Sequence, residues 1–207
     1  MEHIIKNAYL HMFEAVRPLM QVVAQTNAPD LLAWFGAKEV LRELRDTLTA
    51  KYAWAVPNTQ ALYAIGDYGP LVEVGAGTGY WAYLLRLMGV DIVAYDAEPR
   101  LSAQEDWCYE GPKSWTEVLR GTAEEAVRAQ PTRTLLLCWP PADDPMALQA
   151  LRLTAAQHVI FIGWKDDGVT GCCDFHRLLR EQWELVREVE IPQWPEMKDR
   201  LFIYRRR

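Results

Sequence analysis

The first third of the chain carries apolar residues at the spacing of amphipathic helices. The pattern runs over Ile4–Val23 and again over Leu31–Leu48, with a polar, proline-containing turn at residues 27–30 between them. A shorter helix is predicted over Thr59–Ile65. No strand pattern interrupts these segments, so residues 1–66 are predicted to form a helical extension, which we expect to act as a lid.

From Leu71 onward, short and continuous apolar runs alternate with helical stretches. The runs that predict strands are Leu71–Val74, Ile92–Tyr95, Trp115–Leu119, Leu135–Trp139, Val159–Gly163, Trp183–Ile191 and Leu201–Tyr204. The helices predicted between them are Tyr80–Met88, Ala123–Ala129, Pro145–Ala155 and Asp174–Gln182. Apolar strands joined through helices are typical of a mostly parallel sheet covered on both faces. Residues 67–207 are therefore predicted to form one doubly wound α/β domain.

The last two predicted strands have a different connection. They are joined by Pro192–Asp199, a segment without a helical pattern. A parallel pair needs a crossover connection, whereas an antiparallel pair does not. The sheet is therefore predicted to end in an antiparallel hairpin.

Composition and charge narrow the function. Of the 207 residues, 50% are hydrophobic and 24% are charged, the balance of a globular protein. The net charge is −6, so no overall basic field would attract nucleic acid or an anionic membrane, and neither is expected as a partner. No apolar run is long enough to cross a membrane, and the first residues lack a secretory pattern, so a cytoplasmic location is expected.

Several chemistries lack the residues that they need. The chain has no G-x-S-x-G elbow and no P-loop motif. Its four cysteines and four histidines show neither CxxC nor HxxxH spacing, so no metal site is expected. The adjacent Cys172 and Cys173 are interpreted as small buried residues, and His158 and His176 as structural ones.

The strongest motif is the glycine-rich segment E-V-G-A-G-T-G at residues 73–79. A predicted strand runs directly into it and a predicted helix follows. Alternate glycines allow a sharp turn and let a ligand approach bare backbone N–H groups near the start of a helix. Asp96 ends the next predicted strand, where a carboxylate can accept hydrogen bonds from ribose hydroxyls. Together these features predict a cofactor of the nucleoside type.

A dinucleotide cofactor fits this segment less well. The G-x-G-x-x-G/A fingerprint starting at Gly75 would put Tyr80 where a small residue is needed. A shifted register over Gly77, Gly79 and Ala82 has the right letters but begins late after the strand. An NAD-dependent oxidoreductase is therefore kept as a less favoured alternative.

The pattern E-x-G-x-G-x-G resembles the first motif of the class I S-adenosylmethionine (SAM) dependent methyltransferases. The resemblance covers about residues 51–205 and implies a seven-stranded sheet of order 3-2-1-4-5-7-6 with the last strand antiparallel. It implies S-adenosyl-L-methionine as the cofactor, with Asp96 at the ribose and Ala97 near the adenine. The residues that it implies around the methionine part are Glu73, Gly75, Ala76, Gly77 and Gly79.

Three further segments extend the resemblance. Residues 121–124 are similar to the family's G-D-A-E segment, which places Thr122 and Ala123 near the adenine, with Thr122 in place of the usual acid. The segment Cys138-Trp139-Pro140-Pro141 occupies the position that borders both cofactor and substrate. It is similar to the N/D-P-P-Y motif of amino methyltransferases, but Trp139 stands at the amide position and Ala142 at the aromatic one, so methylation of an adenine-like amino group is not supported.

The segment at residues 51–58 precedes the predicted domain. The resemblance implies that it closes over the methionine end of the cofactor, with Tyr52 and Trp54 as contacts. Both rings are equally compatible with core anchors of the helical extension.

The sequence therefore predicts SAM-dependent methyl transfer to an unidentified acceptor. A small molecule or a protein side chain is favoured over nucleic acid because of the negative net charge and the aromatic content of 11%. A methyltransferase-like module that binds SAM without catalysis is the main alternative. No general base is assigned, and the oligomeric state is open.

Overall fold

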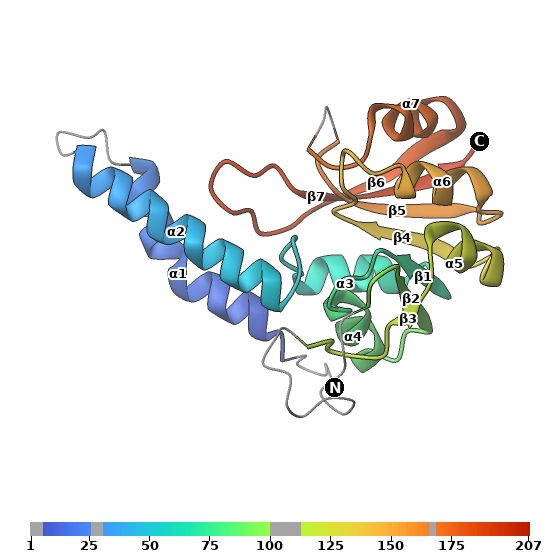
Figure 1. The fold of residues 1–207 in the computed structure, drawn as a ribbon, viewed down its shortest axis with the longest axis horizontal. Coiled ribbons are helices and arrows are strands. Elements are labelled where there is room, and N and C mark those ends of the chain that lie inside the picture. Colours follow the sequence, from blue (N-terminus) through green and yellow to red (C-terminus); the bar gives the residue numbers. More distant parts are fainter. Residues whose placement is uncertain (1–5, 26–30, 100–112, 166–168) are drawn as a thin grey trace.

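The computed structural model describes residues 6–25, 31–99, 113–165 and 169–207, and within them one seven-stranded sheet runs through the molecule (Figure 1). The strand order is β3-β2-β1-β4-β5-β7-β6. The strands are β1 (Leu71–Val74), β2 (Ile92–Asp96), β3 (Leu119–Arg120), β4 (Thr134–Cys138), β5 (His158–Gly163), β6 (Trp183–Glu190) and β7 (Arg200–Arg206). The helices are α1 (Ala8–Gln25), α2 (Leu31–Lys51), α3 (Thr59–Gly66), α4 (Tyr80–Leu87), α5 (Ala123–Ala129), α6 (Met146–Leu153) and α7 (Cys173–Gln182).

The pairing of the strands confirms the predicted fold. β1 pairs in parallel with β2 and β4, and the parallel part continues to β3 on one side and β5 on the other. β7 is antiparallel to both β5 and β6. This is the doubly wound α/β sheet of order 3-2-1-4-5-7-6 that the sequence predicts.

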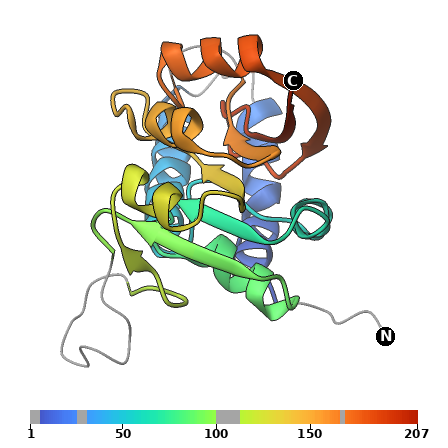
Figure 2. The same ribbon diagram turned by 90° about the vertical axis from the view of Figure 1, so that its right-hand side faces the viewer.

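The two faces of the sheet carry separate hydrophobic cores because side chains alternate along each strand. On β4, Leu136 packs into the core under α3, α4 and the helical extension, whereas Leu135 and Leu137 pack into the core under α5, α6 and α7. Figure 2 shows these last three helices on one side of the sheet and α3 on the other. Continuous apolar strands are needed because both faces are covered.

One strand differs from its prediction. β3 is only two residues long, at the end of the predicted run Trp115–Leu119. Trp115 forms its hydrogen bonds outside the sheet. Its backbone N–H donates to the carbonyl oxygen of Thr78 at 2.8 Å, and its indole Nε1–H donates to the carbonyl oxygen of Lys51 at 2.8 Å. These two bonds keep the start of the run near the glycine-rich segment and away from the edge of β2.

Within the predicted helical extension, α1 and α2 form an arm that projects from the side of the sheet (Figure 1), whereas α3 packs into the core on one face of the sheet. The base of the arm is fixed, because the Trp194 indole N–H donates to the Tyr9 hydroxyl at 3.1 Å and the Asn7 side chain donates to the carbonyl oxygen of Pro57 at 2.6 Å. Further out, Lys38 pairs with Glu196 at 2.6 Å. The role of this arm as a lid stays a prediction.

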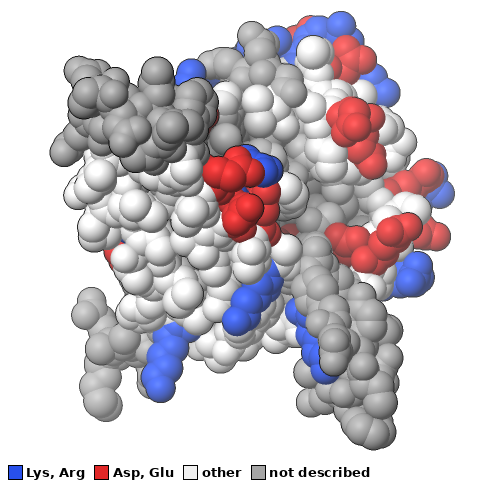
Figure 3. Space-filling view, turned by 60° about the vertical axis from the view of Figure 1, so that its left-hand side comes forward, with Lys and Arg blue, Asp and Glu red and all other residues white. Residues whose placement is uncertain are grey.

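Charged groups on the side of the arm are dispersed. Figure 3 shows acidic and basic side chains in small groups separated by uncharged surface. Ion pairs along one helix include Arg17 with Glu14 on α1 and Arg42 with Glu39 on α2. Among the described residues, no helix combines the length and the hydropathy that a membrane span needs.

The cysteine pair corrects an expectation. Cys173 is exposed and Cys172 is half-buried, so the interpretation of both as buried apolar residues is wrong for Cys173. The reason is local: α7 begins at Cys173, and its apolar stripe is formed by Phe175 and Leu179, which turn the first helical residue outward.

Candidate functional site

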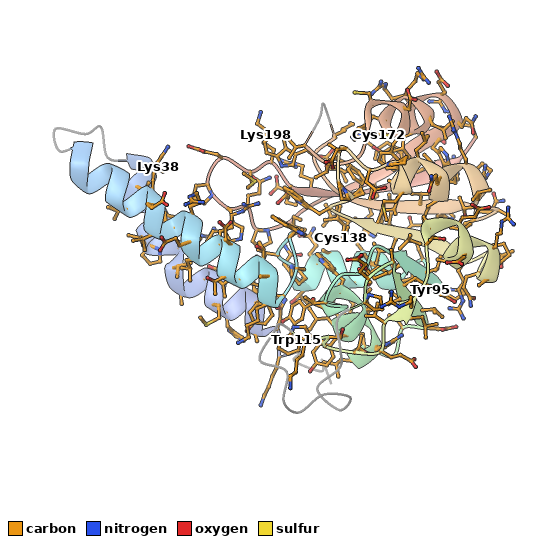
Figure 4. The ribbon with its side chains drawn as sticks, in the orientation of Figure 1. Lys38, Tyr95, Trp115, Cys138, Cys172 and Lys198 are labelled. Atoms are coloured by element: carbon orange, nitrogen blue, oxygen red, sulfur yellow. The ribbon has the colours of Figure 1, made fainter. Side chains whose placement is uncertain are left out.

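The sequence-predicted residues gather at the edge where the parallel strands β1, β2 and β4 end. Figure 4 locates this edge by Cys138 at the end of β4, and it shows the β6–β7 loop, marked by Lys198, on the same side of the sheet. Because β7 is antiparallel, its first residues also lie at this edge, opposite the end of β5. Ligands of open α/β sheets bind beyond such an edge.

The three glycines of the loop after β1 have positive φ angles of +74° at Gly75, +56° at Gly77 and +70° at Gly79. A Cβ atom at Gly75 would lie 2.7 Å from the Met146 side chain, and one at Gly79 would lie 2.7 Å from the Val118 side chain. A Cβ atom at Gly77 would meet nothing within 4 Å. Packing therefore requires Gly79, whereas at Gly75 the close atom is the flexible end of Met146, and Gly77 leaves open space above the loop.

Asp96 joins this loop to the end of β2. Its Oδ2 accepts the backbone N–H of Gly77 at 2.8 Å, and its Oδ1 accepts that of Glu98 at 2.9 Å. The loop is also held by the N–H groups of Gly75 and Ala76, which both donate to the carbonyl oxygen of Tyr95 at 2.9 Å. The carboxylate is thus fixed beside the open position, with lone pairs left for a ligand.

The predicted adenine side lies next to Asp96. The backbone carbonyl of Asp96 accepts the N–H of Gly121 at 3.0 Å, which brings the start of α5 to the end of β2. Thr122 caps α5 in a reciprocal box with Glu125, so its hydroxyl is committed to the helix start. Ala123 is buried and Ala97 is exposed. Their contacts with an adenine ring stay a prediction.

Glu73 is a buried acid beneath the loop. Glu73 is only 1% exposed, and its side-chain oxygen Oε2 has no hydrogen-bond partner. Burial raises the pKa of Glu73 to about 8, against the opposing effects of the Ala82 backbone N–H and the Arg86 charge. A buried acceptor atom without a donor is unfavourable, so it points to a ligand donor at this position.

The segment between α2 and α3 crosses the same edge. The carbonyl oxygen of Tyr52 accepts the hydroxyl of Thr78 in the glycine-rich loop. The Tyr52 ring is buried between Tyr9, at a centroid distance of 5.0 Å, and Trp115, at 5.2 Å. Tyr52 therefore anchors the arm to the loop through its ring and backbone, and a direct contact with the cofactor stays a prediction.

Trp54 lies on the other side of the segment, over β4. Its ring stacks on that of Trp139, with centroids 5.0 Å apart and an angle of 12° between the planes. Both rings line a cavity of about 320 Å³ together with Pro141, while Pro140 is buried behind it. The structure thus brings Trp54 to the predicted substrate-side segment, away from the glycines.

Sequence reasoning missed Asp199 and Arg45. The Trp139 indole N–H donates to Oδ1 of Asp199 at 2.7 Å, and the Arg45 guanidinium lies 5.5 Å from the Trp54 ring centre. Burial raises the pKa of Asp199 to about 6, while the indole bond and Arg45 act in the opposite direction. Asp199 precedes the last strand, and the antiparallel direction predicted for that strand was the signal that could have placed it at this edge.

Taken together, the edge has a glycine loop with a carboxylate on one side and an aromatic cavity with a buried acid on the other. Among the described residues, no three His, Cys, Asp or Glu side chains are grouped so that they could hold a metal ion. The arrangement can cradle a nucleoside-type ligand beside an apolar surface for a second molecule.

Known proteins resemble this chain in fold but not detectably in sequence. No family model matches the chain, and no curated protein matches its sequence. The magnesium protoporphyrin IX methyltransferase ChlM from Synechocystis PCC 6803, crystallised with bound SAM, matches over 100% of both chains with 11% identity and a TM-score of 0.50. The chain therefore has the fold of the class I SAM-dependent methyltransferases.

Two other similar structures are RNA methyltransferases by name. The 23S rRNA methyltransferase ErmE is 14% identical, with 73% of this chain and 69% of that chain covered and a TM-score of 0.46. The putative RNA methyltransferase PH1948 from Pyrococcus horikoshii is 13% identical, with 92% and 98% covered and a TM-score of 0.43. The expectation that nucleic acid is disfavoured as a partner is corrected by this finding. Net charge describes the whole surface, whereas a partner is selected by the local site.

Proposed function

We propose that this protein is a methyltransferase that uses S-adenosyl-L-methionine. The single observation that carries the proposal is the open position at Gly77, whose N–H is bonded to the carboxylate of Asp96 on the neighbouring strand. The φ of +56° favours glycine at this position by itself, and the open space that a Cβ atom would enter leaves room for the close approach of a ligand.

The residues present fit this cofactor in three respects. Asp96 offers acceptor oxygens to ribose hydroxyls, as the acid at this position does in nucleoside-binding sheets. Glu73 has a buried oxygen without a donor, which a cationic amine of the methionine part would supply. Gly77 leaves room for the ligand itself. Gly75, Ala76 and Gly79 shape the loop, and Ala97, Thr122 and Ala123 border the adenine side.

When bound, this cofactor supplies an electrophilic methyl group on a sulfonium ion. The contribution of the chain is to hold the acceptor in line and to exclude water, since proximity and orientation account for much of such catalysis. The segment that carries Tyr52 and Trp54 crosses the edge, and Trp139 and Pro141 line the cavity beyond it, with Pro140 buried behind them. These residues would orient the acceptor beside the glycine loop.

A calorimetric titration with SAM, S-adenosylhomocysteine and NAD tests the proposal. We expect S-adenosylhomocysteine and SAM to bind and NAD not to bind. Asp96→Ala should weaken S-adenosylhomocysteine by about tenfold, because the polar groups that Asp96 satisfies would lose their partner. Asp91→Ala is the matched control, since Asp91 begins the same strand region but is exposed and pairs with Arg133. Absence of binding, or preference for NAD, would overturn the proposal.

A module that binds SAM without catalysis is the second candidate. The observation in its favour is the commitment of Thr122 to the capping box at the position where the methyltransferase family usually has an acid. Binding of S-adenosylhomocysteine without methyl transfer to any acceptor of a broad panel would favour this candidate.

A further inference from the structure

The stacked pair Trp54 and Trp139 is not explained by packing alone. Trp54 is 49% exposed although it is stacked at 5.0 Å on its partner, and it stands at the rim of the cavity of about 320 Å³. Ligand pockets begin at about 300 Å³, so this cavity suits a group of one or two rings rather than a large ligand. A large apolar ring kept in solvent at the edge of a binding cleft is a surface for stacking.

Trp139 is held in an unfavourable backbone conformation. Its φ is +53°, in the left-handed region that residues with a Cβ rarely adopt. The backbone N–H donates to Ile162 at 2.8 Å, and the indole N–H donates to Asp199 at 2.7 Å. Because such strain costs about 1–3 kcal/mol, it persists only where surrounding contacts fix it, and it is common at functional sites. Asp199 thus orients the indole plane.

Arg45 determines what kind of ring the pair can accept. Its guanidinium lies 5.5 Å from the ring centre of Trp54 and 5.8 Å from that of Trp139, so it already occupies the cation position against both rings. The side chain is only 17% exposed, and a second cation beside it would be repelled. A quaternary ammonium or other cationic group is therefore disfavoured, whereas a flat uncharged ring is compatible.

We propose that the methyl acceptor docks a flat, uncharged aromatic or heteroaromatic ring on Trp54, and that Asp199 is a positioning residue that acts through Trp139. That the ring belongs to a methyl acceptor rests on the proposed methyltransferase function, but the ring-binding surface does not depend on the cofactor. The ring has two sources of the same chemistry: a free heterocycle, or a base of a single-stranded nucleic acid, in which bases stack on aromatic side chains.

Ring binding can be measured on the full chain by NMR titration of the indole N–H signals. The probes are quinoline, cytidine and an eight-residue oligocytidylate, each titrated with and without S-adenosylhomocysteine. Trp54→Ala should weaken binding of the ring probes by about tenfold, the usual scale of one stacking contact, and Trp54→Phe should retain most of it. The control is Tyr63→Ala, because Tyr63 on α3 is also 49% exposed but does not line the cavity.

The positioning role of Asp199 is tested by a spectroscopic signal that a general loss of stability would not change. Its carboxylate should shift the Trp139 indole proton downfield, and Asp199→Asn, which still accepts a hydrogen bond, should reduce this shift while keeping ring affinity within about threefold. Asp199→Ala should lose the shift and weaken the ring probes by about tenfold. Should Asp199→Ala fail to fold, Asp199→Leu, which keeps a similar volume but accepts no hydrogen bond, takes its place with the same expected loss of ring affinity, and unchanged affinity would overturn the positioning role.

The outcomes separate the two proposals. If S-adenosylhomocysteine binds but no ring probe does, or if Trp54→Ala and Tyr63→Ala affect the ring probes equally, the inference is overturned and the proposed function stands. If ring probes bind at Trp54 but S-adenosylhomocysteine does not bind, the proposed function is overturned. Tighter binding of oligocytidylate than of cytidine and quinoline would identify nucleic acid as the source of the ring, and the reverse order would identify a free heterocycle.

Discussion

The two halves of the functional edge are built in different ways. The glycine half uses residues that end or directly follow adjacent parallel strands, such as the loop after β1 and Asp96 at the end of β2. The aromatic half brings Arg45 and Trp54, from α2 and the segment after it, together with Trp139 and Asp199, which lie far away in the sequence. The first half is specified by local turns and strand ends, whereas the second depends on how the arm and the last hairpin pack on the sheet.

Each half also contains one buried acid, and the two acids differ in their partners. Glu73 has one unpartnered oxygen, and burial raises its pKa to about 8. Asp199 is equally buried, but the Trp139 indole N–H and the charge of Arg45 limit the increase of its pKa to about 6. A buried carboxyl group keeps its charge to the extent that donors and cations replace its water. In the glycine half this replacement is incomplete.

The largest predicted effect concerns the charge of Glu73. Because its pKa is higher in the folded state than the ordinary value of 4.5, folding favours the protonated form. Its contribution to stability is present below pH 4.5 and is lost as the pH rises to about 8. Glu73→Gln removes this loss, on the order of 4 kcal/mol.

Urea unfolding of both proteins across this pH range measures the effect. The variant should be more stable than the unmodified protein at pH 8.5, and the difference should shrink toward pH 5. If the free energies of unfolding of the two proteins change with pH in the same way, the pKa of Glu73 is not raised by folding, and this prediction is wrong.

The second effect concerns the loop backbone. Gly79→Ala combines a φ of +70° with a Cβ atom 2.7 Å from Val118 and 3.2 Å from Thr116, so we expect a loss of about 3 kcal/mol in the free energy of unfolding. Gly36→Ala is the opposite control, because Gly36 lies inside α2 with nothing within 4 Å, and alanine there should stabilise the helix. Equal stability of the two variants would contradict the packing role of Gly79.

A smaller effect of the same kind is expected for Asp199. Its folded pKa of about 6 exceeds the ordinary value of 3.8, so its contribution to stability is lost as the pH rises between these values. Asp199→Asn should remove this change, on the order of 3 kcal/mol, while retaining an acceptor for Trp139. Thermal unfolding of both proteins between pH 4 and pH 7 checks it, and a difference that appears only above pH 7 would contradict it.

The features that the sequence predicts correctly are those with local signals, as in the glycine half of the edge. The strand order and the antiparallel end are confirmed because continuous apolar strands and a connection without a helix are local signals. The predicted bounds of the third strand, Trp115–Leu119, are wrong, because Trp115 has hydrogen-bonding partners 37 and 64 residues earlier in the chain, Thr78 and Lys51.

The aromatic half shows what local patterns leave out. Trp139 was predicted to border the substrate, but nothing in its neighbourhood along the chain indicates the bond to Asp199 or the positive φ. Arg45 lies on the helical extension and has the spacing of an ordinary surface residue. Such residues can be identified only from the folded structure, because what marks them as a site is that they lie close to one another.

The most direct test of the account uses two glycines that differ only in place. Gly77 has a φ of +56° and Gly89 has one of +80°, and a Cβ atom at either would meet nothing within 4 Å. Alanine at each should cost a similar strain of about 1 kcal/mol in the free energy of unfolding. Only Gly77→Ala should weaken S-adenosylhomocysteine in a calorimetric titration, by about tenfold or more, because its methyl group would enter the space where the cofactor approaches the loop. Equal affinities of the two variants would contradict the assignment of the glycine loop as the cofactor site.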